Sequence, residues 1–248
     1  MLSTLPRPAI FAHRGASLYA PENTLAAFRL AVEQGADAIE LDAKLSADGH
    51  VVVIHDQTVD RTTDGTGRVG ELTLDALRRL DAGSHFGPEF AGEPVPTLEE
   101  VFAAVGAHLP INVELTNYAS LRDRLPEKVA ELVRRHGLEQ RVLFSSFNPL
   151  ALIHVRRELP HAPIGLLAMP GGRGSLARSW PGRLLNYDAL HPAWEDATRR
   201  LIESAQRRGR RVHAYTVNQR PAMETLFDRG VDGIFTDDPI LARQVLNR

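Results

Sequence analysis

Short apolar runs and longer amphipathic stretches alternate along most of the chain. The apolar runs have the length of buried strands, and they predict strands at 9–13, 38–42, 111–115, 142–145, 164–168, 189–191, 212–217 and 233–236. Between them, apolar residues recur at near-3.6 spacing, which predicts helices at 24–34, 97–106, 126–136, 148–158, 195–208, 220–228 and 239–247. Asn23 or Thr24 is the expected N-cap of the first helix. A helix near 170–185 fits the alternation, but its Gly-Gly-Arg-Gly and Pro-Gly sequences are typical of a loop.

This alternation is the pattern of parallel βα units. Eight such units in a chain of 248 residues predict one domain over 1–248 with the (β/α)₈ architecture, the TIM-barrel fold class. The main alternative is an open, doubly wound sheet. No Gly-x-Gly-x-x-Gly sequence follows a predicted strand, so the nucleotide fingerprint of that alternative is absent.

One long segment interrupts the alternation between the second strand and the second helix. Residues 45–96 are rich in Gly, Asp and Thr, and they contain a predicted strand at 51–54 and a short predicted helix at 73–80. Long insertions in compact domains tend to carry function. We therefore expect this insertion to contribute to the site.

Composition and charge exclude several classes of protein. Absence of cysteine rules out a disulfide scaffold, a thiolate metal site and a cysteine nucleophile. A net charge of −2 argues against a nucleic-acid partner. No apolar run is long enough for a membrane span, and the N-terminus lacks the pattern of a signal peptide. We therefore expect a cytoplasmic protein with no membrane insertion; the sequence leaves its oligomeric state open.

Three acidic residues fall on predicted buried strands. Glu40 and Asp42 alternate along one strand and share a face, and Glu114 lies on the next barrel strand. Buried carboxylates are costly unless they are paired or bound to metal. A divalent cation is the simplest compensation, and ligands that are all oxygen favour Mg²⁺ or Ca²⁺ over zinc.

Basic and titratable residues at other strand ends could bind a phosphate group and transfer protons beside these three acids. Arg14 offers a planar fork for phosphate oxygens. His13 follows the first strand and His55 follows the extra strand of the insertion. Two histidines can divide the proton transfers of a displacement at phosphorus. Together with a cation, these residues form a phosphodiesterase constellation that needs no covalent nucleophile.

The motifs that carry these residues resemble the glycerophosphodiester phosphodiesterase family. The matching pieces occur in family order and cover nearly the whole chain: 12–15 (Ala-His-Arg-Gly), 21–24 (Pro-Glu-Asn-Thr), 39–42 (Ile-Glu-Leu-Asp), 48–49, 55–56, 112–114 (Asn-Val-Glu), 216–218 (Thr-Val-Asn) and 230–239. One tripeptide would be weak evidence, whereas six or more pieces in register, each on the expected element, are strong evidence.

The resemblance implies a role for each candidate residue. It makes the insertion a small cap over the barrel mouth, His13 and His55 the acid/base pair, and Arg14 a phosphate ligand. It implies one divalent cation, Mg²⁺ or Ca²⁺, held by the three carboxylates named above. The implied substrates are small glycerophosphodiesters of lipid and glycerol metabolism, cleaved to glycerol 3-phosphate and an alcohol. Attack by the neighbouring glycerol hydroxyl, through a cyclic intermediate, and attack by water both remain open.

Two positions depart from the family pattern. The family commonly has lysine where this chain has Thr116, so a cation beside the phosphate is missing. Lys44, on the second strand, is the candidate to replace it. The family often has tryptophan where this chain has Tyr215, which keeps an aromatic wall and adds a hydroxyl to the substrate pocket. These changes bear on substrate preference more than on the type of reaction.

Other interpretations of the same residues stay open. A neighbouring activity is cleavage of lysolipids like that of phospholipase D or sphingomyelinase D, which an apolar rim at the mouth would favour. A non-catalytic barrel that binds a phosphodiester is another, although binding alone needs no pair of proton carriers. A third interpretation is an aldolase-type barrel that forms a Schiff base with a lysine, and only Lys44 could be that lysine. Among single residues, Asp56 is expected either to orient His55 or to cap a turn. His191 could face the pocket, although a structural role is favoured.

Overall fold

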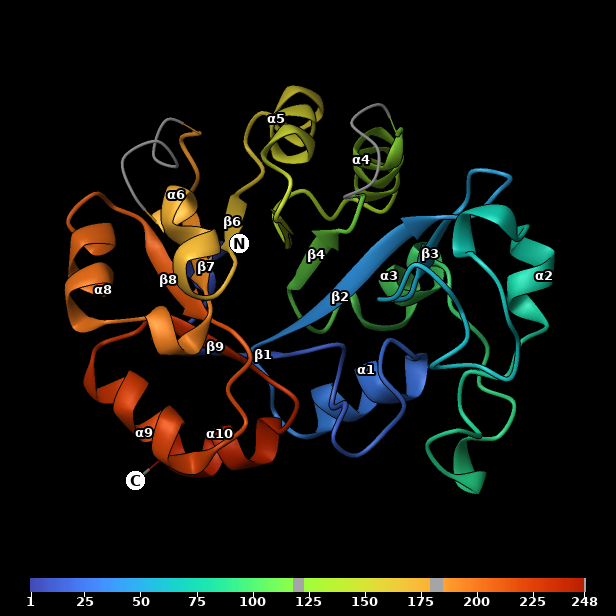
Figure 1. Cartoon of the computed structure of the whole chain (residues 1–248), viewed down its shortest axis with the longest axis horizontal. Helices are drawn as coiled ribbons and strands as arrows, with labels where there is room; N and C mark the ends of the chain where they lie inside the picture. Colours follow the sequence, from blue (N-terminus) through green and yellow to red (C-terminus); the bar gives the residue numbers. More distant parts are fainter. Residues whose placement is uncertain (118–122, 179–184, 248) are drawn as a thin grey trace.

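A computed structural model describes residues 1–117, 123–178 and 185–247. Its centre is a closed barrel of eight parallel strands (Figure 1). These are β1 (Ala9–Ala12), β2 (Ala38–Leu45), β4 (Ile111–Leu115), β5 (Val142–Ser146), β6 (Ile164–Ala168), β7 (Ala189–Pro192), β8 (Arg211–Ala214) and β9 (Gly233–Thr236). β1 pairs with both β2 and β9, which closes the barrel. The TIM-barrel prediction is confirmed, and the open sheet is excluded.

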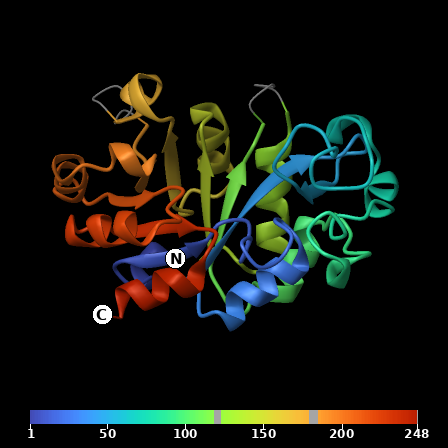
Figure 2. The ribbon, with the colours of Figure 1, turned by 60° about the horizontal axis from the view of Figure 1, so that its bottom comes forward.

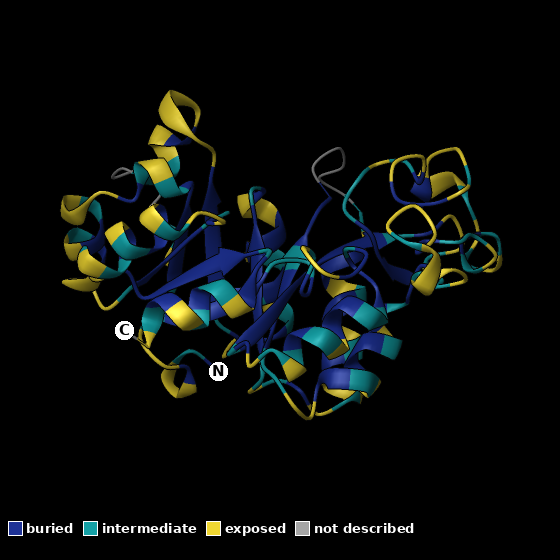
Figure 3. Ribbon diagram, turned by 90° about the horizontal axis from the view of Figure 1, so that it is seen from below, coloured by how far each residue is buried: buried dark blue, intermediate teal, exposed yellow. Residues whose placement is uncertain are grey.

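Helices surround the barrel and present one face to it. They are α1 (Leu25–Glu33), α3 (Leu98–Val105), α4 (Leu125–Arg135), α5 (Pro149–Glu158), α6 (Ser175–Arg178), α8 (Arg199–Gln206), α9 (Arg220–Asp228) and α10 (Pro239–Leu246). Figure 3 shows that the strands are buried whereas the outer faces of the helices are exposed, as amphipathic spacing requires. No helix of the described ranges is long and apolar enough to cross a bilayer.

The segment expected to be either helix or loop contains a short helix. A 3-10 turn at Gly171–Gly174 leads directly into α6. Residues 179–184, the second half of that segment, lie outside the described residues. Of the two expected N-caps for α1, Thr24 has the role, since its hydroxyl accepts the Ala27 N–H at 3.2 Å. Asn23 instead adopts a φ of 59° and turns its side chain into the barrel mouth.

The insertion between β2 and α3 forms a small layer beside the barrel. Its strand β3 (Val51–Val53) runs antiparallel to β2, and its helix α2 (Leu74–Arg78) is slightly shorter than predicted. A separate apolar cluster holds it together, made of Val52, Ile54, Val59, Val69, Leu77, Ala82 and Val95. Figure 2 shows the insertion standing next to the carboxyl end of β2. It therefore has a core of its own and meets the barrel along β2.

The barrel interior changes from apolar to polar along its axis. The N-terminal residues Met1 and Leu5 pack under β1 at the amino end, together with Ala9, Phe11 and Leu143. Toward the carboxyl end, the inward-facing side chains are acids, histidines and amides. The apolar end supplies the burial that stabilises the barrel, which leaves the polar end free for a site.

A first prediction concerns the turn that carries the polar residues after β1. Gly15 has a φ of +86°, and a Cβ there would lie 2.6 Å from Ala27 backbone and side-chain atoms. Gly35 has a similar φ of +73° with nothing within 4 Å. Gly35→Ala should therefore cost only the left-handed backbone strain, about 1 kcal/mol, whereas Gly15→Ala should cost about 2–4 kcal/mol because it also clashes. Urea unfolding of both variants measures this, and equal losses would contradict it.

Candidate active site

A pocket of about 250 Å³ opens at the carboxyl end of the barrel. It is lined by His13, Arg14, Glu40, His55, Asn112, Glu114, Ser145, Phe147, Leu167, His191, Tyr215, Thr216 and Phe235. The sequence analysis assigned a catalytic, substrate-binding or metal-binding role to seven residues, and six of them are in this lining: His13, Arg14, Glu40, His55, Glu114 and Tyr215. The seventh, Asp42, lies beside it with its carboxylate against Arg14 and Asn23. The structure thus brings all seven together.

The barrel register explains why these side chains meet. With the one-residue stagger per strand of this fold, inward-facing residues fall into levels of four from alternate strands. One level contains Glu40, Ser145, His191 and Phe235. The level above it, toward the carboxyl ends, contains His13, Glu114, Leu167 and Tyr215. The first level forms the pocket floor and the second its walls.

The three acids form the strongest concentration of charge in the site. Oxygen atoms of Glu40, Asp42 and Glu114 lie within 4.8 Å of one another, and Glu40 and Asp42 are 2% and 1% exposed. Burial, followed by repulsion from Asp42 and Glu114, raises the pKa of Glu40 well above its usual value. Such a buried set of hard oxygen ligands fits a hard divalent cation, which would offset the repulsion.

Arg14 ties the first turn of the site to two of these acids. Its backbone N–H donates to Glu40 at 2.9 Å, and its Nε lies 3.3 Å from an Asp42 carboxylate oxygen. Its guanidinium also donates to Glu22 at 2.8 Å. Burial lowers the pKa of Arg14, but Asp42, Glu22 and Glu40 outweigh it and raise that pKa overall. Arg14 is therefore a fixed cation in the pocket wall.

His13 is held by a carboxylate through one ring nitrogen. Its Nδ1 lies 2.6 Å from Asp237 Oδ1, and Asp237 also accepts hydrogen bonds from Ser17 and Asn218. Burial raises the pKa of Asp237, but the hydrogen bond and charge of His13, with those of its other partners, lower it overall. This leaves Nε2 of His13 as the ring nitrogen that can meet a ligand.

His55 has the same arrangement on the other side of the pocket. Its Nδ1 lies 2.6 Å from Asp56 Oδ1, so Asp56 contacts the histidine directly. His55 belongs to the insertion and follows its strand β3. The preceding residue, Ile54, donates its backbone N–H to the Asp42 carbonyl at 3.0 Å, which ties this part of the insertion to β2. Each of the two histidines thus has a carboxylate at Nδ1, the arrangement that fixes an imidazole for proton transfer.

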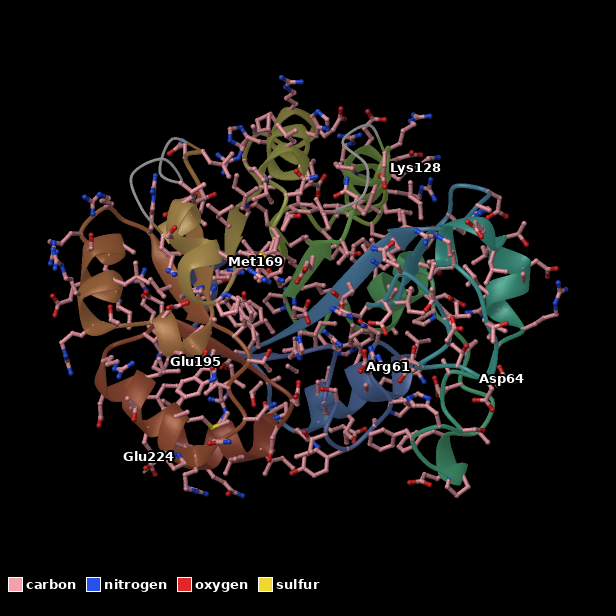
Figure 4. All side chains as sticks on the ribbon, viewed as in Figure 1. Arg61, Asp64, Lys128, Met169, Glu195 and Glu224 are labelled. Carbon is pink, nitrogen blue, oxygen red and sulfur yellow. The ribbon has the colours of Figure 1, made fainter. Side chains whose placement is uncertain are left out.

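Sequence reasoning missed two residues that connect these parts. Glu22 accepts hydrogen bonds from Arg14 and from Arg61, both at 2.8 Å, and Arg61 also donates to Asp56 at 2.7 Å. Figure 4 shows Arg61, a residue of the insertion, near α1 and the segment that precedes it, where its partner Glu22 lies. Glu22 lies in one of the matching motifs, which was the available signal. Arg61 gave none, because its partners lie 39 and 5 residues away.

Thr116, which stands where the family commonly has lysine, contacts Lys44. Lys44 is buried, and its Nζ donates to the Thr116 hydroxyl at 2.8 Å. Burial lowers the pKa of Lys44, while Asp42 and Glu114 oppose that shift. Lys44 does not line the pocket itself. The ammonium therefore lies against residue 116, next to the acidic cluster.

The aromatic wall differs from the expectation in one respect. Tyr215 lines the pocket and packs edge-to-face on Phe147, with ring centroids 6.0 Å apart. Its hydroxyl, however, donates to the Ala168 carbonyl at 2.8 Å. The hydroxyl is thus engaged by the barrel backbone. Tyr215 adds an apolar face to the pocket, and not the polar group that its sequence suggested.

His191 lies in the pocket floor among aromatic rings. It is fully buried, packs edge-to-face on Phe235 and lies 3.3 Å from His213. Burial lowers its pKa to about 3, so the ring is neutral at physiological pH. A Cβ on Gly165 would lie 2.5 Å from the ring, which is why glycine occupies the strand beneath it.

The fold and this pocket together define a barrel hydrolase of the phosphodiesterase type. The model of the glycerophosphoryl diester phosphodiesterase family matches residues 13–241. The chain belongs to this family, and it is an enzyme of the phosphodiesterase class.

Known proteins support the assignment over nearly the whole length. A glycerophosphodiester phosphodiesterase of Caldanaerobacter subterraneus is 44% identical, with 93% of this chain and 94% of the relative covered. One of Bacillus subtilis is 33% identical, covering 94% and 85%. A phosphodiesterase of Oleispira antarctica, solved with the product sn-glycerol 3-phosphate, is 32% identical with a TM-score of 0.90, covering 98% of each chain.

A second prediction tests the ion pairs of Glu22. Burial raises its pKa, but Arg61 and Arg14 outweigh this and lower the pKa from 4.5 to about 2. Because the folded-state pKa is depressed, the stabilisation is present above pH 4.5 and is lost as pH falls toward 2. Glu22→Gln should lower the free energy of unfolding by about 2 kcal/mol at pH 7. Urea titrations from pH 7 to pH 3 should show the deficit shrinking; a deficit independent of pH would contradict it.

Proposed function

We propose that this enzyme hydrolyses glycerophosphodiesters to sn-glycerol 3-phosphate and an alcohol, with His13 and His55 as the acid/base pair. The observation that carries the proposal is the matched pair of histidines. Each is held at Nδ1 by a carboxylate, at 2.6 Å in both cases, and both line one pocket above the acidic cluster. Such pairing supports one histidine accepting a proton while the other donates one.

The substrate would lie between charged and apolar walls. Arg14 would bind phosphate oxygens, since its guanidinium is fixed in the pocket wall. The apolar faces of Tyr215, Phe147 and Leu167 would contact carbon atoms of the substrate on the opposite wall. This arrangement aligns the phosphodiester with the two histidines and makes substrate orientation a part of catalysis.

Glu40, Asp42 and Glu114 would hold one divalent cation, for which we propose Mg²⁺ or Ca²⁺. When bound, such a cation polarises phosphoryl oxygens and stabilises negative charge that develops on them. The chain's own contribution is to hold the three carboxylates together and to keep Arg14 beside them. Lys44 would add a second fixed positive charge behind Thr116.

The proton transfers follow from the two dyads. Nε2 of one histidine would take a proton from the attacking hydroxyl, and Nε2 of the other would protonate the leaving oxygen. Asp237 and Asp56 would hold each ring in one tautomer and stabilise it when it becomes cationic. Both the neighbouring glycerol hydroxyl and water are compatible nucleophiles. We also propose a cytoplasmic role in lipid and glycerol metabolism, with small molecules as the only substrates.

A second candidate function has one specific observation in its favour. Large apolar side chains are exposed on the segments that follow the carboxyl ends of β5 and β6. Leu176 is 68% exposed, Met169 46% and Leu150 41%. An apolar rim of this kind would suit the acyl chain of a lysophospholipid, cleaved in the manner of a phospholipase D.

The test of the main proposal is release of sn-glycerol 3-phosphate from a panel of glycerophosphodiesters. Reactions contain Mg²⁺, Ca²⁺, Mn²⁺ or EDTA. We expect turnover with at least one metal, none with EDTA, and a loss of about 100-fold or more in His13→Ala and in His55→Ala. His161→Ala is the matched control, because His161 is exposed at the amino end of β6, far from the pocket.

The outcomes separate the candidates. Activity that survives in both histidine variants would overturn the acid/base assignment. Turnover of lysophosphatidylcholine, without turnover of any glycerophosphodiester, would establish the second candidate. No turnover with any metal or substrate, combined with a ligand-induced rise in melting temperature, would point to a barrel that only binds.

A further inference from the structure

Arg61 joins the two sides of the candidate site. It lies on the insertion, and its guanidinium binds two carboxylates in a bidentate manner. Toward Glu22 its two terminal nitrogens both donate at 2.8 Å. Toward Asp56 its Nε donates at 2.7 Å and its Nη2 at 3.2 Å. A planar guanidinium is the side chain that can make both pairs at once.

Each carboxylate that Arg61 binds also contacts a residue of the pocket. Asp56 contacts His55 at Nδ1, 2.6 Å away, and Glu22 accepts a hydrogen bond from Arg14 at 2.8 Å. The five side chains thus form one continuous series from Arg14 through Glu22, Arg61 and Asp56 to His55. One end belongs to the barrel and the other to the insertion.

His55 lies beyond the contacts that hold the insertion on the barrel. The insertion pairs with the barrel through the short ladder of β3 on β2, and Val51 and Val53 of β3 pack in the barrel core, whereas the rest of the insertion has a separate apolar cluster. His55 comes two residues after that ladder ends. The side chain of Arg61 is 48% exposed. Arg61 therefore contributes through its charge and the geometry of its hydrogen bonds, and little through burial of its side chain.

We propose that Arg61 is a positioning residue for His55: it anchors Asp56 to Glu22 and so fixes the second imidazole at the pocket. This inference rests on the proposed function. Without Arg61, Asp56 and Glu22 would lose their shared cation, and the insertion loop would lose its ion pair with the segment before α1. The imidazole would then sample positions away from the substrate, and misplacement of a catalytic group lowers turnover more than binding.

The test compares Arg61→Ala and Arg61→Lys with the wild type. Arg61→Ala should lower kcat about 10- to 100-fold on a glycerophosphodiester and change KM little. Because the site of Arg61 is open to solvent, millimolar guanidinium should restore part of kcat, whereas equal concentrations of sodium chloride or urea should not. Arg61→Lys should retain intermediate activity, because an ammonium cannot bind both carboxylates bidentately. Arg79→Ala is the control, since Arg79 is an exposed arginine of the same insertion and its ion pair is with Asp75 of α2.

Every result decides the inference. A wild-type kcat in Arg61→Ala overturns it, and so does a loss that guanidinium does not relieve in a folded variant. If Arg61→Ala is unfolded by circular dichroism, Arg61→Lys carries the test, and a wild-type kcat in that variant overturns the proposal. An inactive wild-type protein would refute the proposed function instead, which keeps the two failures distinct.

Discussion

The close approach of three carboxylates at one point of the barrel, two of them buried, is the constraint on which the rest of the site depends. Glu40 and Asp42 on β2 are buried, and Glu114 on the adjacent β4 is half-buried in the pocket wall. Left alone they would repel one another, and burial together with that repulsion raises the pKa of Glu40 well above its usual value. The surrounding structure places positive charges and hydrogen-bond donors next to these carboxylates. Arg14 contributes its backbone N–H and its guanidinium, Asn23 donates to Asp42, and Lys44 lies behind the cluster.

Those compensating groups have unusual backbone positions. Arg14 and Asn23 both have positive φ, at 57° and 59°, in the turn between β1 and α1. Strain of this kind persists only where surrounding contacts impose it, and it gathers at functional sites. Here the contacts are the bonds to Glu40 and Asp42 themselves. The acids therefore shape the turn that neutralises them, and that turn places His13 at the edge of the pocket.

The two histidines come from different parts of the molecule: His13 from the barrel and His55 from the insertion. His13 and its partner Asp237 come from neighbouring barrel strands, so the rigid sheet sets their distance. His55 and Asp56 come from the insertion, which has its own small core. The ion pairs of Arg61 with Glu22 join the two parts. On this view the barrel provides binding and half of the proton chemistry, while the docked insertion completes it.

Local pattern in the sequence predicted the order of strands and helices and favoured the closed barrel over an open sheet, and the family resemblance added the roles of the seven candidate residues. Apolar runs and strand-end polar residues are local signals, and parallel βα units can close in few ways. The tertiary structure alone decided which residues these candidates contact through hydrogen bonds and ion pairs. Arg61 meets Glu22 across 39 positions of chain, and His13 meets Asp237 across 224. It also decided that the Tyr215 hydroxyl bonds to the barrel backbone and that Lys44 reaches Thr116. Hydrogen bonds between distant segments depend on side-chain direction and packing, which no local periodicity encodes.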